Sequence, residues 1–570
     1  MTFAKHKLNK NPCVDANATL GIDEACFSII NDYNHNITFY ARAPDCYLCE
    51  DLPQANLTAH SNTSFVLTTK YPTHIYYAFD HEYCHETFTF KEHGSYGWNL
   101  SQEELCSHIY TLREPVDSYL PILAVVMTLL LLLIIWKTSA IIIRVIKGKM
   151  SPSNVDGDFD RLQESENTAL PVMRTTKSST RMKSVDTFRG IAILLMIFVN
   201  NGGGQYFFFN HSPWYGLTVA DLVLPWFAWI MGMTITISKR AELRVTTSRV
   251  KIILRSLQRS VILILLGLML NSMHNNSLSH IRLPGVLQML AVTYFVCAVM
   301  EALFMKALSQ DIVFQFGRLT ILRDILDSWP QWLITISIVI THTLITFLLP
   351  VPNCPKGYLG PGGLDFRGNY KNCTGGAAGY VDRLVFGDHI YSNTKNFVYG
   401  TVAHFDPEGL MNTMSAIFVV YLGVHAGKIL LFYYQCNSRI IRWFIWAAIT
   451  GLAAGILCNF EKLEGPIPVI KKIWSLSYVL STSSFAFLLF TVLHLLIDYK
   501  QYWSGAPFVY AGTNPIVLYV GHVLTMHLFP WEWAIPNPTH MSMLAMNLWT
   551  TALWGIIAYV LYAKDIIITV

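Results

Sequence analysis

The stretch that decides the fold is "YLPILAVVMTLLLLLIIW", Tyr119 to Trp136. It carries no charged residue and is long enough to cross the hydrocarbon core of a bilayer, about 30 Å thick, as a helix. Arg144, Lys147 and Lys149 follow it, and basic residues beside a span mark its cytoplasmic end. The run predicts a first transmembrane helix within residues 116–147, with the N-terminal segment on the opposite, lumenal side.

Apolar runs of similar length recur through the rest of the chain. The 570 residues are 52% hydrophobic and 14% charged, whereas about a quarter of the residues of a soluble domain are charged. We expect a polytopic α-helical membrane protein with about 11 transmembrane helices and a cytosolic C-terminus. The net charge of +4 is too small and too dispersed to suggest a nucleic-acid partner. The ten further segments are centred near residues 195, 228, 263, 294, 341, 421, 450, 485, 518 and 553.

Residues 1–115 differ in composition from the rest of the chain. Six cysteines and five Asn-x-Ser/Thr sequons predict a glycosylated lumenal domain in an oxidising compartment. Alternating apolar and polar residues over 36–41 and 64–69 predict strands, so we expect a small disulfide-stapled β-rich domain. The pairing of the cysteines is open, and a zinc or redox role for Cys46 and Cys49 is disfavoured because no second ligand pair follows. The first ten residues contain no apolar signal-peptide region, so either the sequence starts after one or the first span translocates the N-terminus.

The remaining chain divides at a polar segment. Residues 148–184 are rich in Ser and Thr and predict a disordered cytosolic linker. Residues 185–570 then form the main membrane domain, with ten helices and a long lumenal loop, 351–409. Cys354 and Cys373 in that loop are expected to pair with each other.

Two ionisable residues lie where two apolar runs meet, in "FNHSPWYGLTVADL". Charge near a bilayer is costly, which makes His211 and Asp221 candidates for function. With Asn200 they would supply a base, an orienting carboxylate and an amide donor, the groups that acyl transfer requires. The alternatives are an interfacial histidine bonded to backbone and an aspartate that caps its helix or bonds a Ser or Thr.

Other polar residues of the predicted spans are more typical of hydrogen bonds between helices, although His522 could line a site. Cytosolic basic residues are expected of any membrane protein; Arg189, at the start of a span, is the one we single out as a ligand candidate. The sequence contains no nucleotide-binding loop and no metal-binding motif, so we expect no metal.

Several blocks resemble the heparan-α-glucosaminide N-acetyltransferase family over the chain from Ser184 onward. They are "SVDTFRGIAI", "FVNNGGG", "GLTVADLV", "RLPGVLQ", "NCTGGAAGYVDRL", "DPEG", "WSLSYVLSTSSFAF" and "LYVGH". Many of these lie in loops, where shared apolar composition cannot produce them. Residues 185–570 would accordingly be the acyltransferase domain.

The resemblance implies a multi-pass lysosomal membrane enzyme that uses acetyl-CoA from the cytosol. The acceptor would be the amine of the terminal non-reducing glucosamine of heparan sulfate, so that its degradation can proceed. His211 would be the active-site histidine, with Asn200 and Asp221 beside it, and Arg181 and Arg189 would meet the nucleotide. A homodimer in contact with membrane lipid is the family expectation.

Two other functional classes fit the residues alone: a secondary transporter, which polar-dotted spans would suit, and a receptor-like protein that works through its lumenal domain. For a transferase, His211 could act as a general base or as a nucleophile that carries the acetyl group. An ordinary histidine is mostly protonated in an acidic lumen, and burial and Asp221 would shift its pKa in opposite directions.

Overall fold

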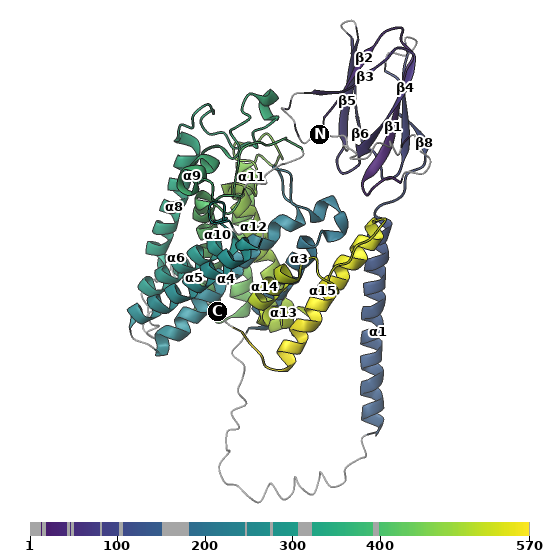
Figure 1. The fold of residues 1–570 in the computed structure, drawn as a ribbon. Helices are drawn as coiled ribbons and strands as arrows, with labels where there is room; N and C mark the ends of the chain where they lie inside the picture. The colour runs from purple at the N-terminus through teal and green to yellow at the C-terminus, as the bar shows by residue number, and fades with distance from the viewer. Residues whose placement is uncertain are drawn as a thin grey trace, which may run out of the picture. The chain divides into compact units, whose positions relative to one another are not determined.

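The structure is a computed structural model of the chain (Figure 1). It describes residues 13, 19–42, 46, 49, 51–79, 82–101, 106–150, 182–245, 248–273, 277–305, 322–391 and 398–568. Residues 117–182, which include the first helix, form one unit, and the rest of the chain forms the other. The first unit consists of α1, Leu120–Met150, whose apolar part is mostly exposed, as lipid-facing side chains are.

The N-terminal part of the second unit is a β-sandwich. In the described residues its strands form two four-stranded sheets, ordered β4-β1-β7-β8 and β3-β2-β5-β6. Burial alternates along β2, as the sequence pattern predicts, and Phe27, Phe39 and Trp98 fill the core between the sheets. The strands are β1 Glu24–Asn31, β2 Ile37–Arg42, β3 Leu52–Leu57, β4 Ser61–Thr68, β5 Thr73–Phe79, β6 Glu82–Phe88, β7 Ser95–Leu100 and β8 Tyr110–Arg113.

Four disulfides fix this sandwich and the long loop. Cys13 pairs with Cys26, Cys46 with Cys49, and Cys84 with Cys106. The pairing expected within the loop, Cys354 with Cys373, is confirmed. The Cys46–Cys49 bond also argues against the zinc alternative, because a disulfide leaves no thiolate to bind metal.

The rest of the second unit is a helical bundle (Figure 1). In the part of the chain that the structure describes, nine helices, α1 included, are long and apolar enough to cross a membrane. The helices of the bundle are α3 Lys183–Asn200, α4 Val219–Val245, α5 Arg249–Ser272, α6 Val286–Phe304, α7 Arg323–Leu326, α8 Trp329–Leu348, α9 Gly376–Phe386, α10 Leu410–Phe432, α11 Cys436–Leu457, α12 Leu476–Leu493, α13 Phe508–Thr513, α14 Pro515–Thr525 and α15 His540–Ala563.

Two predicted spans have an unusual form. The one near residue 195 is α3, which begins with charged residues, and the one near residue 518 is broken between α13 and α14 at Asn514–Pro515. Pro515 lacks the backbone N–H that would continue the helix. The Asn514 side chain donates to the Ile566 backbone oxygen and accepts from the Ile568 N–H. The segment after α15 is thereby hydrogen-bonded to the break between α13 and α14.

Glycines bring the central helices into close contact. A Cβ on Gly232 of α4 would lie 1.9 Å from the backbone oxygen of Val420 in α10, and one on Gly423 would lie 1.9 Å from that of Trp229. Small residues permit such backbone approach between membrane helices. The helix α10 is consequently the most buried of the candidate spans, and it forms the centre of the bundle.

Candidate active site

The chain reverses direction between α3 and α4 at three successive glycines. Gly202, Gly203 and Gly204 all adopt positive φ, which side chains disfavour. The Asn547 side chain from α15 accepts from the Gly204 N–H at 2.9 Å and so anchors the turn. The segment that follows carries His211 back toward the start of α4.

His211 and Asp221 are in direct contact and form a dyad. His211 Nδ1 lies 2.8 Å from Asp221 Oδ1. The other carboxylate oxygen, Oδ2, accepts from the Ser212 N–H at 3.2 Å, the Thr218 N–H at 3.2 Å and the Thr218 hydroxyl at 2.9 Å. Asp221 is fully buried, so these donors hold it as an anion in one orientation. With Nδ1–H donated to Asp221, the lone pair of a neutral His211 is on Nε2.

The structure gives Asp221 both of the contacts named as alternatives in the sequence analysis, in addition to its contact with His211. Asp221 does bond a Thr and cap the first turn of its helix through Thr218, and it orients His211 with its second oxygen. A carboxylate with this arrangement fixes the tautomer of a neighbouring imidazole, which is the positioning that a catalytic base needs.

Lys471 is a member of the site that the sequence analysis missed. Its Nζ lies 2.8 Å from His211 Nδ1, 3.1 Å from Nε2 and 3.6 Å from Asp221 Oδ1. The His211 side chain remains 47% exposed. Its pKa is nevertheless lowered from the ordinary value, first by loss of solvation and then by the charge of Lys471, against the opposite influence of Asp221.

The Lys471 loop reaches His211 through backbone pairing. Tyr215 and Ile470 form an isolated antiparallel bridge, and the Gly216 N–H donates to the Val469 oxygen at 2.9 Å. Ile470 is fully buried. The loop between α11 and α12 is thereby fastened to the segment that carries His211.

Asn200 and His522 form a second pair. Asn200 Nδ2 lies 3.1 Å from His522 Nε2, so His522 is the partner that the structure gives to Asn200. An amide nitrogen has two hydrogens, and this contact uses one of them. The direct association of Asn200 with His211 stays a prediction.

The two arginines proposed as nucleotide ligands have different outcomes. Arg181 lies outside the described residues. Arg189 donates to Asp186 at 3.2 Å and to the Gly512 backbone oxygen at 3.0 Å, which ties α3 to α13. A role for Arg189 at the nucleotide stays a prediction, beside this structural one.

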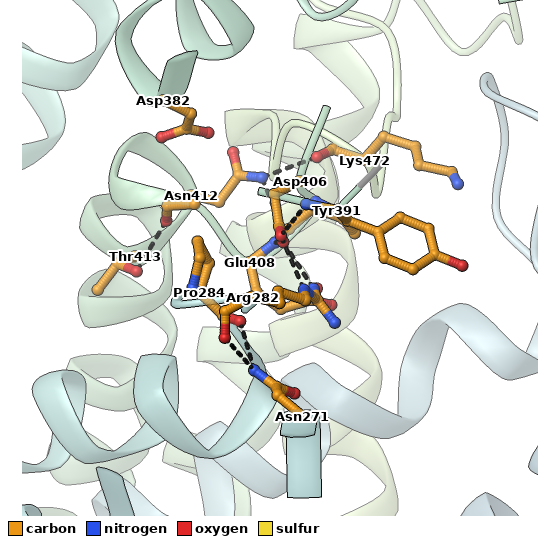
Figure 2. Close-up of polar contacts among 12 residues, drawn as sticks. Asn271, Arg282, Pro284, Asp382, Tyr391, Asp406, Glu408, Asn412, Thr413 and Lys472 are labelled. Carbon is orange, nitrogen blue, oxygen red and sulfur yellow. Dashed lines mark hydrogen bonds and ion pairs between the residues drawn. The ribbon is translucent and has the colours of Figure 1, made fainter. Parts of the chain in front are cut away.

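A charged cluster lies at the start of α10 (Figure 2). Arg282 donates from Nε to Asp406 at 2.8 Å and from Nη2 to the other Asp406 oxygen at 2.6 Å, and it also pairs with Glu408. The Asn412 side chain bridges the backbone oxygens of Pro407 and Lys472 at 2.8 Å each. The bond to Lys472 fixes the backbone directly after Lys471, as the Tyr215 bridge fixes the backbone directly before it.

No group of three or more His, Cys, Asp or Glu side chains within the described ranges is arranged to hold a metal ion. The chemistry that this site offers is that of an oriented imidazole beside a carboxylate and an ammonium.

Comparison with known proteins identifies the family. No family model matches the chain. The human heparan-alpha-glucosaminide N-acetyltransferase is 39% identical over 593 aligned positions, which cover 96% of this chain and 88% of the relative. The mouse protein of the same name is 37% identical, with 96% and 89% covered. The chain belongs to the heparan-alpha-glucosaminide N-acetyltransferase family.

Proposed function

We propose that the protein transfers the acetyl group of cytosolic acetyl-CoA to the amine of the terminal non-reducing glucosamine of heparan sulfate. The reaction would take place in the lysosomal membrane and would prepare the polymer for further degradation. The names of both relatives support this substrate class and reaction. The observation that carries the proposal is the His211–Asp221 dyad, in which Nδ1 lies 2.8 Å from a buried carboxylate.

The surroundings of His211 support a lumenal acceptor site. The Trp214 indole donates to the Leu359 backbone oxygen at 2.9 Å and packs in one cluster with Tyr399 and Phe405. Leu359 belongs to the loop that carries the Cys354–Cys373 disulfide. Disulfides persist in oxidising compartments such as the secretory lumen, so the His211 segment shares the side of that loop.

The donor would arrive from the opposite end of α3. Asn200 lies eleven positions after Arg189 in α3, a rise of about 17 Å at 1.5 Å per residue. The nucleotide would remain near the basic end of this helix, and the long pantetheine arm would extend the thioester toward His211.

In the direct mechanism, His211 Nε2 accepts a proton as the acceptor nitrogen attacks the thioester carbonyl. The new C–N bond replaces the C–S bond, and the thiolate of coenzyme A leaves with the proton that Nε2 took from the amine. The second hydrogen of the Asn200 amide would be available for the thioester oxygen as charge develops there. In the alternative mechanism, His211 Nε2 attacks the thioester carbonyl first, the C–S bond breaks and the thiolate of coenzyme A leaves. The sugar amine then attacks the acetyl carbonyl, the bond between the acetyl group and Nε2 breaks, and the amine loses its proton.

The test is acetyl transfer by purified protein in detergent, with acetyl-CoA and a glucosamine-terminated oligosaccharide. We expect His211→Ala to lose nearly all turnover while its elution profile and melting temperature match the wild type. Turnover close to wild type in this variant would refute the assignment. Mass spectrometry after incubation with acetyl-CoA alone separates the mechanisms, because only the nucleophilic one leaves an acetyl group on His211.

A further inference from the structure

The Lys471 ammonium is the charged group in contact with His211 that the proposed mechanism leaves without a role. It lies within 3.1 Å of both ring nitrogens and 3.6 Å from Asp221. The Lys471 side chain is only 13% exposed, and Asp221 is completely buried. A protonated His211 would thus place two cations in contact beside a single carboxylate.

The position of Lys471 is imposed by the backbone on both sides of it. The Tyr215–Ile470 bridge fixes the preceding residue, and the Asn412 amide holds the backbone oxygen of the following one, Lys472. Figure 2 shows the Lys472 side chain extending away from Asn412. Long side chains carry considerable rotamer entropy, and this anchoring of the loop lowers the cost of ordering Lys471.

The charges around His211 come from two elements. Asp221 on α4 favours the protonated imidazole, whereas Lys471 and Lys472 on the loop disfavour it, with Lys472 the weakest of the three. Burial lowers the pKa of the Lys471 ammonium, and the carboxylates of Asp221 and Glu408 oppose that shift. Glu408 is itself held by Arg282. Asp221 is therefore the carboxylate in contact with Lys471, and Glu408 is a second carboxylate that favours its charge without a direct contact.

We propose that Lys471 is a positioning residue that keeps His211 neutral, with Nδ1–H donated to Asp221 and the Nε2 lone pair available to the acceptor amine in an acidic compartment. This inference rests on the proposed function of His211. Asp221 alone would stabilise an imidazolium, which has no lone pair for a proton. The Lys471 ammonium provides a positive charge beside the Asp221 carboxylate. The negative charge of Asp221 is thus balanced without protonation of His211.

The sign of the pH effect follows from this arrangement. A base works in its deprotonated form, so activity is lost as the pH falls below the pKa of His211. Removal of the Lys471 charge raises that pKa, and the acid limb of the kcat/KM profile moves to higher pH. Two positive charges this close to each other repel even in water and more strongly inside a protein. For this half-exposed ring we expect a shift of about one pH unit.

The experiment compares four proteins in detergent with acetyl-CoA and a glucosamine-terminated oligosaccharide between pH 4.5 and 8. Lys471→Met should move the acid limb upward by about one unit, whereas Lys471→Arg, which keeps the charge, should leave it close to the wild type. Lys472→Met removes the same charge from the adjacent residue and should produce a much smaller shift. If Lys471→Met does not give monodisperse protein, Lys471→Gln carries the same prediction.

An unchanged acid limb in Lys471→Met and Lys471→Gln would overturn the proposal, even if their rates fall equally at every pH. Such a result would mean that Lys471 supports the structure of the site without affecting the protonation of His211. Equal shifts in Lys471→Met and Lys472→Met would also overturn it, since contact with the ring would then have no special effect. Absence of acetyl transfer by the wild type at every pH would instead refute the proposed function itself.

Discussion

The Asp221→Asn substitution tests the dyad with little change in shape. Three donors converge on Asp221 Oδ2, namely two backbone N–H groups and the Thr218 hydroxyl. An asparagine must turn its carbonyl oxygen toward these donors, which leaves its NH2 group facing His211 Nδ1. Nδ1 then has to accept a hydrogen bond, and the hydrogen of neutral His211 moves to Nε2. The imidazole stays in place with its lone pair on the wrong nitrogen.

The expected loss is large because the tautomer, and not only one contact, changes. In hydrolases with a carboxylate–histidine pair, the same replacement lowers kcat by about 10⁴-fold. Asp221→Asn keeps the three bonds at the Oδ2 position, so we expect a fall of about 10³- to 10⁴-fold in kcat, equivalent to about 4–5 kcal/mol. The KM for acetyl-CoA should change little, since the dyad makes no contact with the nucleotide in the proposed mechanism.

The assay is steady-state acetyl transfer at saturating donor, together with the melting temperature in detergent. Thr218→Val is the matched control, because it removes one bond to Oδ2 but leaves the carboxylate facing His211. It should retain most of the activity. A decrease of less than tenfold in Asp221→Asn, with a melting temperature near that of the wild type, would refute the tautomer argument.

Two further predictions concern stability. Asp382 Oδ1 accepts from the Leu410 N–H at 2.8 Å while burial raises the pKa of the carboxyl from 3.8 to about 7. The folded state then retains a proton that the unfolded state has lost, so stability falls as the pH rises from about 4 to 7, by ~4 kcal/mol at most. Between about pH 4 and 7 the melting temperature of the wild type should decrease more than that of Asp382→Asn. Parallel plots of melting temperature against pH for the two proteins would contradict the raised pKa of Asp382. Gly232→Val should abolish the monodisperse peak in fluorescence-detected chromatography, because α4 and α10 could no longer come into contact at this position. Gly555→Ala is the control, since its Cβ meets nothing within 4 Å, and it should behave as the wild type. A normal elution profile for Gly232→Val would show that the two helices do not cross at Gly232.

The parts of the fold that follow from local sequence were predictable. Alternation over 36–41 corresponds to β2, and the Cys354–Cys373 pair is close in sequence within one loop. The dyad could also be predicted, because ten residues around a turn connect His211 to Asp221. The break at Asn514–Pro515 had a signal in the sequence, since this dipeptide favours turns.

The remainder depends on contacts that local patterns do not encode. Lys471 is 260 residues from His211 and reaches it through one backbone bridge. Asn200 meets His522 across 322 residues. Such partners are set by the packing of helices and loops, whose order in space cannot be read from hydropathy. The sequence therefore indicated His211 and Asp221 as a candidate pair but not the cation beside them.

The central claim is that one site receives a donor from the cytosolic face and an acceptor from the disulfide-bearing face. Proteoliposomes with uniform orientation test it most directly, with acetyl-CoA on one side only and a glucosamine-terminated oligosaccharide on the other. We predict N-acetylated sugar in the acceptor compartment for the wild type and none for His211→Ala. Product that forms only when donor and acceptor share a compartment would contradict the account.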